Sequence, residues 1–420
     1  MTRSACVALE HNSAFGQFSR LGSAALRQMS DTQPDVVVVG GGLVGKAAAL
    51  SLAQTGLHVR LCGVRDAAPA PAAGFAQRIY AFNAASRALL QRLRVWDQVP
   101  AARVQPVVSM RIAGDGAALR FDAAEQGVEA LAWIAEADAI ERALDLALRF
   151  ERGVALQPQR VVAALRPAHD WTLQLDDGSH LRCALLLGAD GRSSRVRGWA
   201  GIGQRSRPYG QTAVVANFAC DGAHGATAHQ AFTDDGVIAL LPLPQQQVSL
   251  VWSAPDALAA EFMHDPERLT QRLVQALPAL GAQHLGALRA AGEVGGWPLL
   301  LQRAHSLVGD GAALLGDAGH VLHPMAGHGL NLGLQDVQAL AAVLAARGVQ
   351  SCADARLLRR YARARAEQIL ALELATDGLH RLYAPSWLAP LRALGLSATE
   401  HLPAVKRWLA GYASGLGVLS

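Results

Sequence analysis

The chain has 420 residues, of which 51% are hydrophobic and 17% are charged. This length and apolar content suffice for two or three domains with buried cores, and they exclude a disordered or fibrous protein. The net charge is +4, and Lys46 and Lys406 are the only lysines among 38 basic residues. The arginines are scattered without interleaved aromatic residues, so the sequence does not predict nucleic-acid binding.

The five cysteines form no CxxC pair, which indicates a reducing compartment and argues against a cysteine zinc site. No apolar run is long enough to cross a bilayer. We therefore expect a cytoplasmic protein whose membrane contact, if it has any, is peripheral and on the inner membrane. Residues 1–34 are typical of a flexible tail, and Met29 offers a second possible start of translation.

The first ordered elements predict a β-α-β unit. Residues 36–39 (VVVV) form a continuous apolar strand, Gly40-x-Gly42-x-x-Gly45 follows it, and a helix and a second strand at 59–62 come next. Glycines at this spacing allow a tight turn that brings a pyrophosphate to a helix N-terminus. The alternative is that these glycines only form a tight turn and bind no ligand.

Two features complicate this unit. Gly45-Lys46-Ala47 almost completes a P-loop, but Ala47 lacks the hydroxyl that would bind Mg²⁺, so we do not favour an NTPase. The acid expected about 20 residues on to bind a ribose is replaced by Gly63, with Arg65 nearby. That pair leaves open a site for the 2′-phosphate of NADP, or a flavin whose adenosine ribose is bound in another way.

Further along the chain, short strands dominate before helices return. Residues 171–175 and 179–188 predict a hairpin, which ends in Gly188-Ala189-Asp190-Gly191. Residues 209–253 predict a β-meander, and 312–315 a short strand before a helix over 330–344. The domains expected from this pattern are a tail (1–34), a first Rossmann part (35–205), a β-sheet substrate domain (206–299), a second Rossmann part (300–348) and a helical region (349–420).

The stretch GDAGHVLHPMAGHGLNLGLQD, residues 316–336, carries three histidines close to Asp317. His320 and His323 lie in a loop at a spacing that suits no helical zinc site, so no metal is predicted. A hydrolytic triad is disfavoured because the chain has no Gly-x-Ser-x-Gly. The third possibility is that Asp317 binds a polyol and that backbone N–H groups of Gly329, Leu330 and Asn331 face an anionic ring.

Three motifs in order now resemble one family. They are "VVVVGGGLVG", "LLLGADGRSSRVR" and "LLGDAGHVLHPMAGHGLNLGLQD", which are similar to those of the class A flavoprotein aromatic hydroxylases. "QRIYAFNAASRALLQRLRVWD", "YGQTAVVAN" and "ALLPL" point within that class to the UbiH/UbiF/VisC family of ubiquinone-biosynthesis hydroxylases. The resemblance spans nearly all residues from 35 onward.

The resemblance implies an α/β fold with a Rossmann-type FAD-binding domain, an inserted mixed or antiparallel β-sheet substrate domain and C-terminal helices. FAD would be the bound cofactor, and NAD(P)H a transient reductant. The pyrophosphate would lie at the glycine turn, and Asp317 would bind the ribityl chain. The residues assigned to FAD are Gly40, Gly42, Gly45, Arg78, Asp190, Gly191, Asp317, Pro324, Gly327, Gly329, Leu330 and Asn331.

The implied reaction is hydroxylation of a polyprenylated phenol, a ubiquinone precursor, with O₂ and through a flavin hydroperoxide. His323 and His328 are the candidates for moving the phenol proton, or else they pack the loop. The C-terminal segment with Trp387 and Trp408 would dock on the membrane or on other ubiquinone-biosynthesis enzymes, or pack on the FAD domain. An NADP-dependent reductase and a non-catalytic flavin-binding scaffold remain as alternatives.

Three positions depart from the family pattern. Gly63 replaces the usual acid, Ala137 stands where Asn or His usually follows Glu136, and Ala231 stands where the family has Arg. The first concerns binding of the adenosine ribose, and the other two concern the choice of substrate or the rate. At this point we expect replacement of Asp317 to release FAD and replacement of His320 to matter little.

Overall fold

A computed structural model describes residues 33–383, except 68, 70–73 and 324–327, together with residue 399. The expected tail up to residue 32, including Met29, lies outside the described residues. So do Pro324, Gly327 and the segment with Trp387 and Trp408. Within the part of the chain that is described, no helix has both the length and the apolar character needed to cross a bilayer.

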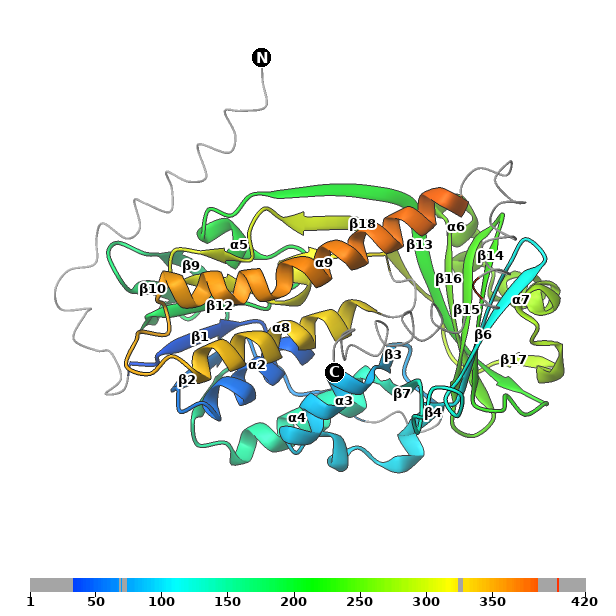
Figure 1. Ribbon diagram of the computed structural model, residues 1–420, viewed down its shortest axis with the longest axis horizontal. Helices are drawn as coiled ribbons and strands as arrows, with labels where there is room; N and C mark the ends of the chain where they lie inside the picture. The colour runs from blue at the N-terminus through cyan, green and yellow to red at the C-terminus, as the bar shows by residue number, and fades with distance from the viewer. Residues whose placement is uncertain (1–32, 68, 70–73, 324–327, 384–398, 400–420) are drawn as a thin grey trace, which may run out of the picture.

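A six-stranded sheet forms the centre of the cofactor half, shown in Figure 1. Its strands are parallel except at the β19 edge. In spatial order they are β19 (Val308–Gly309), β20 (Ala312–Leu314), β12 (Leu185–Gly188), β1 (Val36–Val39), β2 (Val59–Cys62) and β8 (Val154–Gln157). The central strands are buried on both faces, which explains their continuous apolar sequences.

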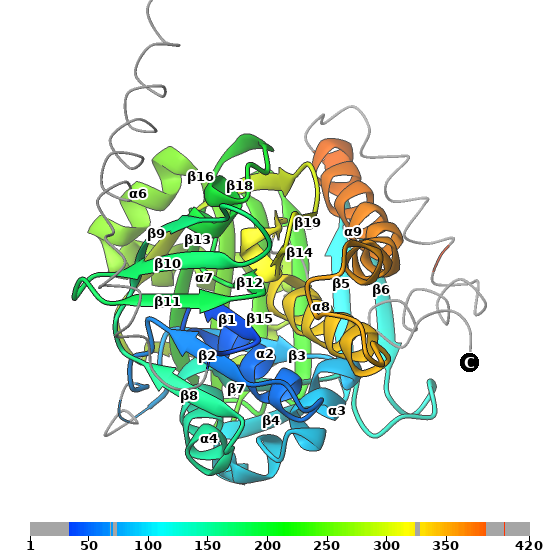
Figure 2. The ribbon, with the colours of Figure 1, turned by 90° about the vertical axis from the view of Figure 1, so that its left-hand side faces the viewer.

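Different elements cover the two faces of this sheet. Val36 and Val38 pack under helices, whereas Val37 packs under a small antiparallel sheet. The helices are α2 (Leu43–Ala53), α4 (Ala137–Phe150), α8 (His328–Ala345) and α9 (Ala355–Tyr383). The small sheet consists of β9 (Val161–Leu165), β10 (Trp171–Leu175) and β11 (His180–Cys183). Figure 2 shows the central sheet between these two layers.

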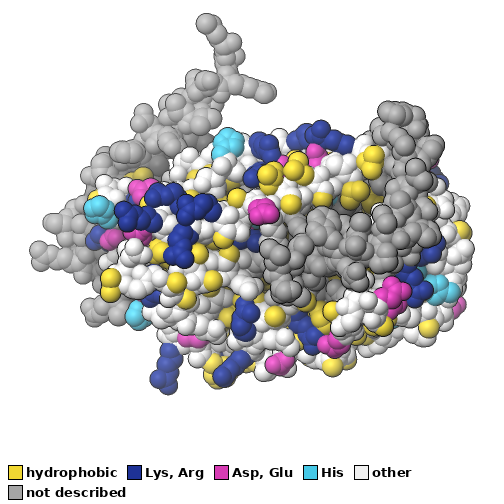
Figure 3. Space-filling model, viewed as in Figure 1, with side chains coloured by type: hydrophobic (Ala, Val, Ile, Leu, Met, Phe, Trp, Pro, Cys, Tyr) yellow, Lys and Arg dark blue, Asp and Glu magenta, His cyan; other side chains and the backbone are white. Residues whose placement is uncertain are grey.

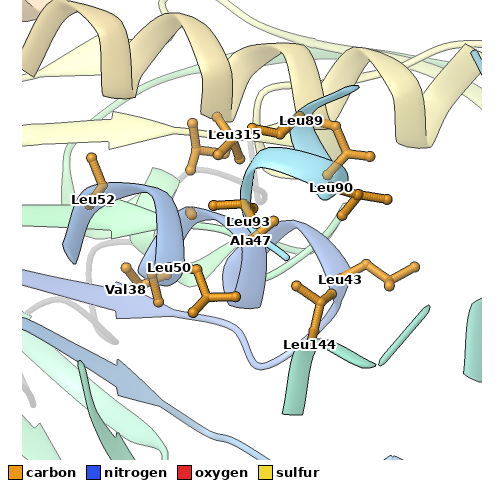
Figure 4. Close-up of a cluster of buried hydrophobic side chains, with 14 of the residues drawn as sticks. Val38, Leu43, Ala47, Leu50, Leu52, Leu89, Leu90, Leu93, Leu144 and Leu315 are labelled. Atoms are coloured by element: carbon orange, nitrogen blue, oxygen red, sulfur yellow. The ribbon is translucent and has the colours of Figure 1, made fainter. Parts of the chain in front are cut away.

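Helix α2 is embedded in the apolar core rather than lying on the surface. Figure 4 shows its leucines meeting side chains from β1, α3 (Ala84–Arg92) and α4. Leu50 and Leu52 are both at most 2% exposed. Burial of a leucine contributes about 1.5–3 kcal/mol, so this contact fixes where the N-terminus of α2 lies.

A nine-stranded sheet forms the other half. Its order is β21 (His320–Val321), β18 (Gly295–Ala304), β13 (Gln204–Cys220), β16 (Gln247–Pro255), β15 (Gly236–Leu243), β14 (Thr227–Thr233), β5 (Ser109–Gly114) and β6 (Ala117–Asp122), and β17 (Leu288–Ala290) pairs with β13. Helices α6 (Asp256–His264) and α7 (Pro266–Leu280) contribute to its apolar core. The sheet thus draws strands from outside 206–299, because β5 pairs in parallel with β14.

A third sheet joins the two halves. It consists of β3 (Ile79–Phe82), β7 (Ala132–Glu136) and β4 (Val104–Val107). β4 and β7 contact β15 of the large sheet, and β3 contacts α8 of the cofactor half. Residues near 78 therefore lie between the two halves.

One predicted strand is wrong in detail. Residues 179–188 do not form a single strand, because the chain leaves β11 at Cys183 and enters β12 at Leu185. Cys183 pairs with Trp171 in the small sheet, whereas Leu185 pairs with Val36 in the central sheet. The single apolar run thus contributes strands to two different sheets. The periodicity of the sequence could not show at which residue one strand ends and the next begins.

Candidate functional site

Three loops meet at one edge of the central sheet. They follow β1, β12 and β20, whose registers align Val39 with Gly188 and Gly188 with Leu314. Because the strands are parallel, their carboxyl ends share an edge. The predicted motifs at 40–45, 188–191 and 316–317 are therefore brought together there.

In the glycine turn after β1, Gly40 and Gly45 are tightly packed against the backbone, whereas Gly42 faces open space. A Cβ on Gly40 would lie 2.2 Å from the carbonyl oxygen of Ala189, and one on Gly45 would lie 1.8 Å from that of Gly40. A Cβ on Gly42 would meet no atom within 4 Å. Gly42 is also the N-cap of α2 and provides no side-chain hydrogen bond there. Open space in front of a helix N-terminus suits an anionic pyrophosphate.

Lys46 is not available to a phosphate. Its ammonium is 0% exposed and forms an ion pair with Asp145 of α4, with Nζ 2.6 Å from Oδ1. It also donates to the carbonyl of Arg65, at 3.4 Å. Lys46, the residue that most suggested a P-loop, thus joins α2, α4 and the loop after β2. The NTPase alternative therefore lacks both a lysine free to bind phosphate and, because of Ala47, the hydroxyl that would bind Mg²⁺.

Asp190 uses its carboxylate to cap the short helix α5 (Arg195–Trp199). Its Oδ2 accepts hydrogen bonds from the backbone N–H groups of Arg195, at 2.7 Å, and Val196, at 3.2 Å. Gly191 has φ +78°, which favours glycine. Asp190 therefore shapes the loop beside the glycine turn, and its assignment to FAD stays a prediction.

Asp317 follows β20 at the edge where the three loops meet. Its side chain is exposed to solvent, yet the surrounding protein raises its pKa through desolvation. The nearby charges of His320, Arg192 and Arg78 act on the pKa of Asp317 in the opposite direction. Asp317 is thus an accessible carboxylate within electrostatic reach of two other predicted segments, as a polyol-binding acid beside a cofactor should be.

The loop that carries Asp317 is held by a buried ionic network. His320 is 2% exposed, and its Nε2 lies 2.7 Å from Oδ2 of Asp336 in α8. Oδ1 of Asp336 accepts from Nε of Arg365, also at 2.7 Å, and Oδ2 accepts from the backbone N–H of Gly316. Replacing His320 should therefore cost stability, contrary to the expectation that it matters little, because the buried carboxylate of Asp336 would lose this hydrogen bond, at a cost of about 1–3 kcal/mol.

Arg197 joins two of the three loops, and sequence reasoning missed it. Its guanidinium is buried and donates to the carbonyls of Ala318, at 2.8 Å, and Arg192, at 3.0 Å. Gln302 of β18 also donates to the carbonyl of Arg192, at 2.7 Å. Arg197 lies inside the quoted motif "LLLGADGRSSRVR", but its partner lies 121 residues away, so the sequence carried no signal for this contact.

Arg78 is half-exposed at the junction of the two halves. Its side chain is 51% exposed and lies 3.8 Å from Glu141, and it donates to the hydroxyl of Tyr80 at 3.3 Å. Its charge also acts on Asp317. This position agrees with a cation on the cofactor side, although a direct role in binding stays a prediction.

His323 is buried where the large sheet meets the loop before α8. It is 1% exposed, and its Nε2 lies 3.2 Å from Oε1 of Gln211 in β13. Its ring packs edge-on against Tyr209, with ring centroids 4.9 Å apart. His328 is the first residue of α8, and its side chain lies outside the described residues.

The start of α8 is fixed by Asn331. The side-chain amide of Asn331 donates to the carbonyl of Ala81 at 2.7 Å and accepts from the backbone N–H of Asn83 at 3.0 Å. The Asn331 side chain is therefore occupied by the protein, and only its backbone could face a cofactor. A Cβ on Gly329 would meet no atom within 4 Å, so the helix start is open at that residue.

The three departures from the family pattern receive different explanations. Gly63 has φ +74°, and its N–H donates to the carbonyl of Gln157 at 2.8 Å, so the backbone itself favours glycine. Ala137 is fully buried and donates its N–H to the carbonyl of Arg78 at 2.8 Å. Ala231 is 1% exposed within the apolar core under α7, where an arginine would be desolvated.

The open space at Gly42, beside the tightly packed Gly40 and Gly45, and the position of Asp317 fit an FAD site. Comparison with known proteins identifies the cofactor. Residues 33–375 match the family model described as FAD binding domain. The chain belongs to this family. The predicted FAD cofactor and the predicted enzyme class, an FAD-dependent monooxygenase, are confirmed.

The curated relatives are ubiquinone-biosynthesis enzymes, which confirms the predicted membership of their hydroxylase family. Ubiquinone hydroxylase UbiL of Rhodospirillum rubrum is 34% identical, over 92% of this chain and 90% of its own. The 3-demethoxyubiquinol 3-hydroxylase of Escherichia coli is 35% identical, over 92% of this chain and 100% of its own. The human mitochondrial monooxygenase COQ6 is 31% identical, over 92% and 93%.

Solved structures confirm the predicted fold class. The p-nitrophenol 4-monooxygenase PnpA of Pseudomonas putida is 20% identical with a TM-score of 0.74, covering 92% of this chain and 99% of its own. The probable FAD-dependent monooxygenase pqsL of Pseudomonas aeruginosa is 23% identical with a TM-score of 0.72, covering 88% and 100%. At these identities the likeness concerns the fold alone.

Proposed function

We propose that this FAD-dependent monooxygenase hydroxylates the aromatic ring of a polyprenylated phenol, a precursor of ubiquinone, with NAD(P)H as reductant and O₂ as oxygen source. The names of the relatives support this substrate class. The observation on which the proposal rests is the meeting of the glycine turn, Asp317 and the start of α8 beside the large sheet. Neither a reductase with NADP at the glycine turn nor a non-catalytic scaffold is favoured by these relatives.

Bound FAD would accept electrons from NAD(P)H and pass one oxygen atom of O₂ to the ring. The residues of this chain bind and orient it. The N-terminus of α2 at Gly42 would hold the pyrophosphate, Asp317 would accept hydrogen bonds from the ribityl hydroxyls, and the start of α8 at Gly329 and Leu330 would face the ring system. The positive end of the α8 dipole there would favour negative charge on the bound ring system.

His323 is our candidate for handling the phenol proton. Nε2 lies 3.2 Å from Oε1 of Gln211; with this oxygen as acceptor, Nε2 would carry the hydrogen and Nδ1 would be the nitrogen able to take up a proton. Packing against Tyr209 holds the imidazole in that orientation. An ordered base near the ring would assist loss of the phenol proton and make the ring more electron-rich. His328 remains a second candidate.

The five-segment domain division also remains a proposal. We extend the substrate side by β5 and β6, because they complete the large sheet. We further propose that the protein works on the cytoplasmic side of the inner membrane, beside other ubiquinone-biosynthesis enzymes. The proposal is supported by the substrate class, because a polyprenylated phenol dissolves in the bilayer and the enzyme has to meet it there.

A gene deletion tests the proposed function. The strain lacking this gene should accumulate one quinone precursor that lacks a ring hydroxyl, and expression of the chain should restore ubiquinone. Asp317→Ala should not restore it, whereas Asp310→Ala, which changes an 85% exposed carboxylate on the neighbouring loop, should. Normal ubiquinone content in the deletion strain, in the absence of a second hydroxylase gene, would show the proposal to be wrong.

A further inference from the structure

The outer face of α9 carries an arginine cluster, defined as Arg356, Arg359, Arg360 and Arg363. Their spacing of three and four residues places all four on one side of the helix, and all four are exposed. Many arginines elsewhere pair with a carboxylate, as Arg160 does with Asp176. Within the described residues no ion pair is formed by any member of the cluster.

The same side of α9 becomes apolar toward its C-terminal end. Leu370 and Leu374 continue the face of the arginine cluster, and their side chains are 43% and 64% exposed. Helix α9 lies along the face shown in Figure 1, and Figure 3 shows Lys and Arg side chains gathered over its beginning. Glu367 lies between the two groups and leaves the arginines in excess.

Further arginines border the leucines on their other side. A groove of about 470 Å³ lies between α9, β13 and β18, and Arg205, Arg207, Leu374 and Arg381 contribute to its walls. Arg205 pairs with Glu373, whereas Arg207 and Arg381 share Asp377. The leucines are thus an apolar centre with basic residues at both ends, the arrangement of surfaces that bind in the interface of an anionic bilayer.

The groove lies over a packed apolar cluster, with which it shares Leu301. Beneath α9, Ile369 and Leu372 pack in one cluster with Leu301, Leu322 and Leu332, and Tyr209 packs against it. Leu322 precedes His323, and Leu332 follows Asn331 at the start of α8.

We propose that the arginine cluster and Leu370 and Leu374 dock this enzyme on an anionic lipid bilayer, with the groove toward the membrane. The proposal rests on the proposed function in one respect, because the bilayer is where a polyprenylated phenol dissolves. The excess of positive charge favours anionic lipid, and the leucines favour its hydrocarbon boundary. Docking itself needs no catalytic step.

Sedimentation of the FAD-loaded full chain with vesicles tests the docking. The protein should bind vesicles of phosphatidylcholine with phosphatidylglycerol, and bind phosphatidylcholine alone much more weakly. Each arginine near an anionic surface strengthens binding about fivefold. The quadruple variant Arg356→Gln, Arg359→Gln, Arg360→Gln and Arg363→Gln should therefore bind at least about 100-fold more weakly. Leu374→Ala should weaken binding about tenfold.

The matched control removes the same charge elsewhere. Arg92→Gln, Arg94→Gln, Arg149→Gln and Arg152→Gln change four exposed arginines around α3 and α4, away from α9 in Figure 1. This control should keep its vesicle binding, and FAD content reports folding of both variants. Equal loss in the control, equal binding to neutral vesicles, or capture of an acidic protein with no vesicle binding would overturn the proposal.

Turnover of a water-soluble, short-chain phenol separates docking from function. The quadruple variant should oxidise NAD(P)H with this phenol as the unmodified chain does, and should lose turnover only with a long-chain substrate presented in anionic vesicles. A chain that hydroxylates the short phenol but never binds vesicles would overturn the docking and leave the proposed function intact. A chain that binds vesicles but hydroxylates no phenol would overturn the proposed function and leave the docking intact.

Discussion

Nε2 of His320 and Oδ2 of Asp336 lie 2.7 Å apart in the interior, and Arg365 closes the network from the other side. Although desolvation raises it, the pKa of Asp336 is lowered overall by the charges of His320 and Arg365 and their hydrogen bonds. Because Asp336 also accepts from the N–H of Gly316, this network fixes the backbone that presents Asp317. Structural and cofactor-binding roles thus belong to neighbouring residues of one motif.

Asp336→Asn should therefore destabilise the protein by about 3–5 kcal/mol, because it leaves the charge of Arg365 buried and unpaired. Chemical denaturation measures the change. Asp310→Asn, which changes an 85% exposed carboxylate paired with Arg166, is the control and should change stability by less than about 1 kcal/mol. Equal stabilities of the two variants would contradict a structural role for the network.

Asp317→Ala should lower FAD affinity by about 10- to 100-fold, the effect of losing a charged hydrogen-bond acceptor to a ligand. Thermal stability without FAD should stay close to that of the unmodified chain, since the side chain is exposed. Flavin absorbance per protein after gel filtration and a fluorescence titration measure the loss. If Asp317→Ala retains FAD as the unmodified chain does, the role given to this carboxylate is wrong.

Two glycines of one turn should respond in opposite ways. Gly45→Ala places a methyl group 1.8 Å from a carbonyl oxygen and should destabilise the fold by about 1–3 kcal/mol. Gly42→Ala meets no protein atom, so the fold should stay intact while FAD binding weakens. Unfolding and FAD titration of both variants test this pair. Unchanged FAD affinity in Gly42→Ala would mean that no ligand lies close to that position.

The large sheet should lose stability in mild acid because of His229. This side chain is 4% exposed, its Nδ1 lies 3.1 Å from the carbonyl of Leu280, and burial, with His284 and Arg111 nearby, lowers its pKa to about 4. The unfolded chain takes up the proton near pH 6.5. Stability is therefore complete above about pH 6.5 and falls by about 3 kcal/mol as the pH drops toward 4.

Urea denaturation at several pH values tests this dependence. His229→Gln should flatten the decline between pH 6.5 and 4, whereas His58→Gln, which changes a side chain that is 77% exposed, should leave it unchanged. Parallel curves for His229→Gln and the unmodified chain would show that other groups cause the decline. The test does not depend on FAD affinity or on activity.

Much of the cofactor half could be predicted, because its signals are local. The strand 36–39, the glycine turn and the helix after it follow within 20 residues, and their apolar periodicity and motif agree. Asp336 also had a signal that was not used: it stands between Leu332 and Leu340, one turn away on each side, and an acid among apolar helix positions indicates a buried partner.

The remaining features depend on contacts between distant segments. β5 pairs with β14 across more than 100 residues of chain, so the sequence placed residues 109–122 in the cofactor half. Lys46 suggested a phosphate ligand until Asp145, on another helix, was found beside it. The roles of Arg197 and Asn331 likewise depend on backbone carbonyls from other segments, which no side-chain pattern records.

Ring hydroxylation by this protein can be tested by supplying the FAD-loaded chain with NAD(P)H, a prenylated phenol and ¹⁸O-labelled O₂. We expect a product whose new ring hydroxyl carries the label, with NAD(P)H consumed in proportion to the product. Mass spectrometry measures the label and the amount of product, and the loss of NAD(P)H absorbance measures the consumption of NAD(P)H. NAD(P)H oxidation without labelled product, with every available prenylated phenol, would contradict the assignment of this chain as a ring hydroxylase.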